Sequence, residues 1–141
     1  MSEGLIFRHF ENKEGLLNAI MEEGEKRAES LFADIVLEKD PKTVLRKTLD
    51  IGPRMSADPE AKDFWKLQYK LKWELEQYGE HKTEPLRLAL ANAFKALGYP
   101  NADMEAMQLM LIMDGWAMRY YLSAAFDVHA VAQALKEKYG L

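Results

Sequence analysis

Apolar residues recur along this chain at the 3.6-residue spacing of amphipathic helices, and nowhere does the sequence alternate as a half-buried strand does. Short Asp-Pro, Asn and Gly signals separate the periodic stretches. The pattern predicts helices at about residues 12–38, 41–52, 59–78, 85–98, 103–125 and 127–139, after a short helix at 2–10. We therefore expect an all-α fold with a body of six helices.

Side-chain oxygens at the expected helix starts support these boundaries. Asn12, Asp40, Asp58 and Asp127 each precede a periodic stretch, and such residues accept hydrogen bonds from the first free N–H groups of a helix. The Gly52-Pro53 pair is expected to end or kink the second helix, because proline lacks a donor and clashes with the preceding turn.

The segment from 104 to 126 is the most apolar of the chain, and its apolar residues occupy two faces of a helix. A helix that is apolar nearly all round is buried on two sides. In a chain of this length, one side meets the core and the other most simply meets a second subunit. Gly115, in the middle of this helix, costs about 1 kcal/mol relative to alanine, which indicates close approach of a neighbouring backbone.

Composition narrows the class of protein without deciding its function. A length of 141 residues with 48% hydrophobic and 30% charged content fits one globular domain with a core. The absence of cysteine excludes disulfides and cysteine-based sites. A net charge of -4 gives no overall electrostatic footprint for nucleic acid. No apolar run is long enough to span a membrane and no signal-peptide pattern opens the chain, so we expect a cytoplasmic protein.

The polar residues form no catalytic motif. The three histidines, His9, His81 and His129, lie far apart, and no metalloprotease, nucleophile-elbow, phosphate-loop or dinucleotide motif occurs. Glu74 and Glu76 with His81 are better interpreted as a solvated surface than as metal ligands. We expect no enzymatic activity, no cofactor and no metal site.

The first residues carry a motif that points to DNA. Residues 2–17 read SEGLIFRHFENKEGLL, which resembles the closing half of the helix-turn-helix of TetR/AcrR transcriptional regulators, of the form S-x-G-x-[LI]-[YF]-x-H-F-x-[SN]-K-[ED]-x-L-[LI]. In that family this segment carries the recognition helix, a short turn and the start of the helix that joins the head to the body. The matching residues are Ser2, Gly4, Ile6, Phe7, His9, Phe10, Asn12, Lys13, Glu14, Leu16 and Leu17.

The resemblance implies that residues 1–13 form part of a DNA-binding head. Side chains at the start of the recognition helix would reach base edges, and the basic residues would reach phosphates. The family pattern also places two further helices before Met1, and a recognition helix needs the preceding helix to brace it. We therefore expect either a chain shortened from a longer regulator or a natural form without the head. The candidate DNA-binding residues are Ser2, Glu3, Gly4, Phe7, Arg8, His9 and Lys13.

The resemblance further implies that residues 14–141 form a ligand-binding and dimerisation domain of the TetR-like helical bundle. Met, aromatic and isolated polar residues on two helices would line a flexible apolar cavity for a small hydrophobic effector; the alternative is that they simply fill the core. Asp114 is the most informative, because a carboxylate on a buried face needs a partner such as Arg119, a backbone amide or a cationic ligand. The candidate ligand-binding residues are Phe64, Trp65, Gln68, Met107, Met110, Asp114, Met118 and Tyr121.

TetR-like proteins dimerise through two helices of the C-terminal half, which here correspond to residues 85–98 and 103–125. A D-G dipeptide, often found in one of those helices, is present at Asp114-Gly115. The candidate residues of a homodimer interface are Leu86, Leu90, Phe94, Leu109, Ile112, Met113, Trp116 and Tyr120.

Two hypotheses for function follow, and they differ in mechanism. In the first, the protein is a dimeric repressor or activator that binds operator DNA once its missing N-terminal helices are present. An effector in the body would then shift the long helix at 12–38 and change the spacing of the recognition helices. In the second, the chain is a headless small-molecule-binding or dimerisation module without autonomous DNA binding.

Overall fold

The computed structural model describes residues 12–141, and every regular element in that range is an α-helix. The predicted all-α class is therefore confirmed. The expected helix at 2–10 lies outside the described residues, together with the candidate DNA-binding residues that precede residue 12. The helices are α2 (Lys13–Val36), α3 (Pro41–Leu49), α4 (Ile51–Ser56), α5 (Pro59–Glu74), α6 (Glu80–Ala96), α7 (Ala102–Leu122) and α8 (Val128–Lys138).

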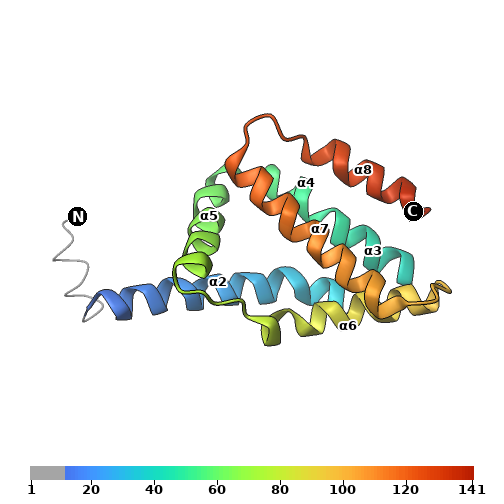
Figure 1. Ribbon diagram of the computed structural model, residues 1–141, viewed down its shortest axis with the longest axis horizontal. Helices are drawn as coiled ribbons and strands as arrows, with labels where there is room; N and C mark the ends of the chain where they lie inside the picture. The colour runs from blue at the N-terminus through green and yellow to red at the C-terminus, as the bar shows by residue number, and fades with distance from the viewer. Residues whose placement is uncertain (1–11) are drawn as a thin grey trace.

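The helices form a bundle that is closed at one end and more open at the other. Figure 1 shows α2 and α6 side by side along one edge, with α7 packed on α6. The consecutive helices α3 and α4 lie between the α2–α6 pair and α8. Helix α8 packs on both α3 and α4. Helix α5 stands across the bundle and packs on α2 and α4. The N-terminal end of α2 projects past α5 from the body (Figure 1).

The core occupies the closed end, where α3, α6 and α7 meet. Leu45, Leu90, Phe94 and Leu109 are fully buried there. The ring of Tyr139, which follows α8, lies 5.4 Å from that of Phe94 and joins the C-terminus to the core. Burial of side chains of this size supplies the main favourable free energy of folding.

The predicted helix caps are confirmed at all four positions. The Asn12 carboxamide oxygen accepts a hydrogen bond from the Gly15 N–H at 2.7 Å. Asp40 accepts from the N–H of Thr43, and Asp58 from that of Ala61. Asp127 accepts from the N–H groups of two residues in the first turn of α8. The first free N–H groups of these helices are thus satisfied by the residue types that the sequence supplies.

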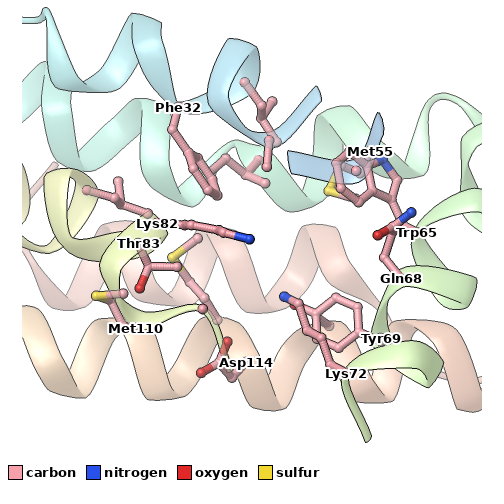
Figure 2. Close-up of a pocket in the computed structure, with 18 of the residues that line it drawn as sticks. Phe32, Met55, Trp65, Gln68, Tyr69, Lys72, Lys82, Thr83, Met110 and Asp114 are labelled. Carbon is pink, nitrogen blue, oxygen red and sulfur yellow. The ribbon is translucent and has the colours of Figure 1, made fainter. Parts of the chain in front are cut away.

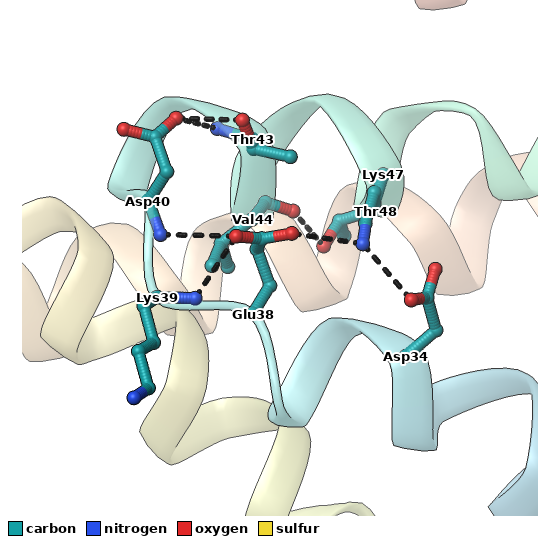
Figure 3. Close-up of polar contacts among 8 residues, drawn as sticks. All are labelled: Asp34, Glu38, Lys39, Asp40, Thr43, Val44, Lys47 and Thr48. Atoms are coloured by element: carbon teal, nitrogen blue, oxygen red, sulfur yellow. Dashed lines mark hydrogen bonds and ion pairs between the residues drawn. The ribbon is translucent and has the colours of Figure 1, made fainter.

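Charged side chains fix the corner between α2 and α3 (Figure 3). The Lys47 ammonium lies 2.9 Å from carboxylate oxygens of both Asp34 and Glu38. Glu38 also accepts hydrogen bonds from the backbone N–H groups of Lys39 and Asp40. The hydrogen bond from Lys47, followed by those from the backbone, lowers the pKa of Glu38. These contacts join the C-terminal end of α2 to α3.

Three helix boundaries differ from the sequence prediction. Asp50 separates α3 from α4, so the expected helix at 41–52 is two helices. Pro53 lies in the first turn of α4, where no helical donor is required of it, and Gly52-Pro53 therefore does not end a helix. Helix α5 ends at Glu74 and α6 begins at Glu80, so Pro85 lies inside α6 rather than at its start.

Candidate functional site

A cavity of about 960 Å³ lies between α2, α5 and α7 at the open end of the bundle (Figure 2). Residues of α3, α4 and α8 close it on one side, and the segment joining α5 to α6 lies at the other. A volume of this size is at the upper end of the range of small-molecule sites. The sequence left open whether the body holds a cavity or a filled core, and these residues enclose a cavity.

The cavity is apolar at one end and polar at the other. Its apolar end is formed by buried residues such as Leu49, Ile51 and Ala132, from α3, α4 and α8. Its polar end carries Lys72 and Lys82, which Figure 2 shows pointing into the cavity. A bound ligand would therefore contact apolar side chains at one end of the cavity and charged side chains at the other.

The shape of the apolar end depends on a close fit between α4 and α7. A Cβ atom at Gly52 would lie 1.8 Å from the Trp116 ring, so the indole occupies the space that any side chain there would need. Trp116 also lines the cavity, with Met55 and Met113 beside it. Methionine side chains adapt to irregular gaps, which suits a site that accepts flexible apolar groups.

Asp114 lies on the cavity wall and is held by a tyrosine from the α5–α6 segment. The Tyr78 hydroxyl donates a hydrogen bond of 3.0 Å to its carboxylate. Burial raises the pKa of Asp114, while this hydrogen bond and the charge of Lys72 oppose that shift. Burial, together with the Asp114 charge, raises the pKa of Tyr78 to about 12. Arg119, the partner suggested by the sequence, forms no ion pair with Asp114 within residues 12–141.

The two lysines at the polar end differ in their partners. Lys82 forms an ion pair with Glu25 of α2. Lys72 has no ion-pair partner within the part of the chain that the structure describes, and its ammonium lies 4.9 Å from the centre of the Tyr69 ring. Burial lowers the pKa of Lys72, although the charge of Asp114 raises it. Lys72 is thus a cation at the cavity without a carboxylate bonded to it.

Gln68 connects the cavity wall to α2. Its amide Nε2 donates a hydrogen bond of 2.9 Å to the backbone carbonyl of Ile20. Its side chain also fills the space above Gly24, where a Cβ atom would lie 2.2 Å from Oε1. Gln68 is buried, lines the cavity and lies against α2, so it contacts both the cavity and that helix.

Five of the eight candidate ligand-binding residues line the cavity, namely Trp65, Gln68, Met110, Asp114 and Tyr121. Phe64 does not, because the Arg27 guanidinium covers its ring at 4.0 Å and Trp65 packs against its edge. Met107 and Met118 do not line the cavity either: they lie on the outer face of α7, with 42% and 51% of their surface exposed.

Most of the candidate dimer residues point inward in the single chain. Leu86, Leu90, Phe94 and Leu109 are 0–3% exposed within the single chain and leave no surface for a partner. Three others face the cavity, and Tyr120 is half-buried against the Trp116 ring. The three that line the cavity are Ile112, Met113 and Trp116.

Sequence reasoning missed the face of α7 that is exposed. Leu111 and Leu122 are 60% and 73% exposed, and a Cβ atom at Gly115 would meet nothing within 4 Å. Every member of this face recurs after three or four residues, so together they form one stripe along the helix. We call this stripe the outer α7 face, and its members are Met104, Met107, Leu111, Gly115, Met118 and Leu122.

Of the candidate DNA-binding residues only Lys13 is described, and it is exposed in the first turn of α2. Within residues 12–141 no group of three or more His, Asp or Glu side chains is placed to hold a metal ion. Over the same residues no helix is both long and apolar enough to cross a membrane.

Comparisons with known proteins leave the site to be interpreted from its geometry. No family model, no curated protein and no solved structure matched this chain.

Proposed function

We propose that this protein is a ligand-responsive transcriptional regulator of the TetR-like type, with its effector bound in the cavity of the helical body. The observation that carries this proposal is the position of α2. One part of this helix forms a wall of the cavity, and its first residues, 13–17, are the last residues of the motif at 2–17. A ligand that displaces α2 would therefore displace the end of that motif.

Gln68 supplies the contact through which the effector acts. A ligand that displaces its side chain breaks the hydrogen bond to Ile20 and frees the space above Gly24. Because α2 is held at its C-terminal end by the Lys47 ion pairs, loss of this contact lets the N-terminal half tilt. The ligand shifts the equilibrium between two orientations only by as much as its affinities for them differ.

A homodimer through the outer α7 face completes the proposal. Its apolar side chains form one continuous stripe, and a two-fold axis brings the same stripe of a second copy against it. Gly115 lies in the stripe with free space above it, which permits the two backbones to approach closely. The dimer positions two recognition helices for successive turns of the DNA major groove.

Selection from a random pool of DNA duplexes, with protein isolated from its own host, tests the proposal. Enrichment of a two-fold symmetric site, with half-sites about ten base pairs apart, is the expected result. The matched control is Lys13→Glu, which should weaken binding to all duplexes because Lys13 would contact phosphate. Recovery of no sequence would contradict the regulator and leave the headless binding module.

A further inference from the structure

We propose that the cavity binds an amphipathic acid, with its apolar body between α4, α7 and α8 and its carboxylate at Lys72 and Lys82. This inference rests on the proposed function, because it names the chemical class of the effector. It is carried by the division of the cavity into an apolar and a charged end.

The apolar end fits a hydrocarbon chain or ring. Its walls come from buried aliphatic residues and from the Trp116 indole. The charged side chains that line the cavity come from α2, α5, the α5–α6 segment, α6 and α7, and none comes from α3, α4 or α8. A uniformly polar guest would lose its hydration inside without gaining partners.

The charged end fits an anion. The ammonium groups of Lys72 and Lys82 come from two different helices and point into the same space (Figure 2). Lys82 already forms an ion pair with Glu25, so the positive charge that a bound carboxylate would meet is mainly that of Lys72, with which it would form a charge-assisted hydrogen bond. Lys72 brings a positive charge that no carboxylate of residues 12–141 pairs with.

The acidic groups of the cavity leave the Lys72 ammonium without a directly bonded carboxylate among residues 12–141. Glu25 is paired with Lys82. Asp114 accepts a hydrogen bond from the neutral Tyr78 hydroxyl and keeps its charge, which acts on Lys72 without forming an ion pair. Glu29 and Glu76 are exposed, where water and salt screen their charge. An amphipathic cation would have to approach two ammonium groups before reaching the apolar end.

Titration of the purified chain with three probes of equal tail length tests the inference: dodecanoate, dodecan-1-ol and dodecyltrimethylammonium. Fluorescence of Trp65 and Trp116, which line the cavity, reports binding; a Trp73→Phe background removes the signal of the exposed third indole. We expect dodecanoate to bind about tenfold more tightly than the alcohol.

Variants assign the preference to the proposed head site. Lys72→Met should weaken dodecanoate binding about tenfold and leave the affinity for the alcohol unchanged, because the methionine keeps the apolar stem. Lys70→Met is the matched control, since Lys70 is exposed on the same helix and does not line the cavity. It should change neither affinity.

Each contrary outcome would overturn one part of the proposed binding mode. Equal affinities for dodecanoate and the alcohol, or no effect of Lys72→Met, would overturn the carboxylate site. Preference for dodecyltrimethylammonium, or binding of none of the probes, would overturn the amphipathic acid. DNA selection without any probe tests the proposed function separately, so the two failures are distinguishable.

Discussion

The side chain of Gln68 on α5 occupies the space that a side chain at Gly24 on α2 would need, with Oε1 only 2.2 Å from the position of a Cβ atom there. A side chain at position 24 would therefore have to move the Gln68 amide away from its hydrogen bond to Ile20, although alanine is the better helix former. The contact also joins the cavity wall to α2, whose first residues belong to the proposed DNA-binding motif.

Gly24→Ala should therefore destabilise the fold by about 1–2 kcal/mol, because the displaced amide loses its buried hydrogen bond to Ile20. The double variant Gly24→Ala with Gln68→Ala should recover stability, since the shorter side chain vacates the space. Urea unfolding of the parent, the two single variants and the double variant measures the coupling free energy between residues 24 and 68. A single Gly24→Ala variant more stable than the parent would contradict the fit.

Gly52→Ala should be more damaging than most glycine-to-alanine changes. The added methyl group collides with the Trp116 ring, and overpacking of this kind costs about 1–3 kcal/mol. Gly52→Ala with Trp116→Leu relieves the collision and should restore part of the loss. Thermal unfolding checks both variants, and an unchanged midpoint for Gly52→Ala would show that the indole does not lie against α4.

The oligomeric state tests the outer α7 face. Leu111→Glu should give a monomer in analytical ultracentrifugation, because it would bury a charge in an apolar interface. Leu37→Glu changes a residue exposed at the end of α2 and should leave the dimer intact. Gly115→Ala should weaken the dimer while stabilising the isolated chain by about 1 kcal/mol. A Leu111→Glu protein that still sediments as a dimer would place the interface elsewhere.

Asp114 should make stability fall as pH rises. Its pKa is raised by burial in the folded chain, so the folded state holds this proton more tightly than the unfolded state does. Its carboxylate therefore opposes folding above the folded pKa, and the effect disappears as pH falls below the unfolded value of about 4. Asp114→Asn should be more stable than the parent at neutral pH, with the difference closing in acid. The control is Asp63→Asn, because Asp63 is exposed. If the free energy of unfolding of the two variants changed in parallel with pH, Asp114 would not be the source of the pH dependence.

Tyr121→Phe should stabilise the fold. The Tyr121 hydroxyl is buried and has no hydrogen-bond partner among residues 12–141, so its removal relieves a desolvation cost of about 1 kcal/mol. Tyr78→Phe removes a hydroxyl that is bonded to Asp114 and should not stabilise. Chemical unfolding distinguishes the two, and a loss of stability in Tyr121→Phe would mean that the hydroxyl has found a partner.

The sequence predicts the helices of this fold well because their starts are local. Asn12, Asp40, Asp58 and Asp127 cap helices through bonds to residues two or three positions away. The start of α6 could not be predicted in the same way, since Gly79 precedes it without a side-chain cap. Pro85, the stronger sequence signal, lies inside that helix instead.

The orientation of α7 could not be predicted from its sequence, because the helix is apolar nearly all round. Both Met113 and Met118 are methionines and could lie on a buried or an exposed face. In the structure Met113 lines the cavity and Met118 is exposed. The packing partners decide, above all Gly52, whose missing side chain admits Trp116. Such a fit between residues far apart in the chain does not appear in the helical periodicity of the sequence, so periodicity cannot predict which face of α7 is buried.

The central claim is that occupancy of the cavity is communicated along α2 to DNA. The most direct measurement is the affinity of the parent protein for its selected duplex, by fluorescence anisotropy, with and without a concentration of dodecanoate shown to saturate the cavity. We expect a change of about tenfold or more in the parent protein and a much smaller one in Gln68→Ala, which lacks the contact to Ile20. An unchanged affinity in the saturated parent protein would contradict the account.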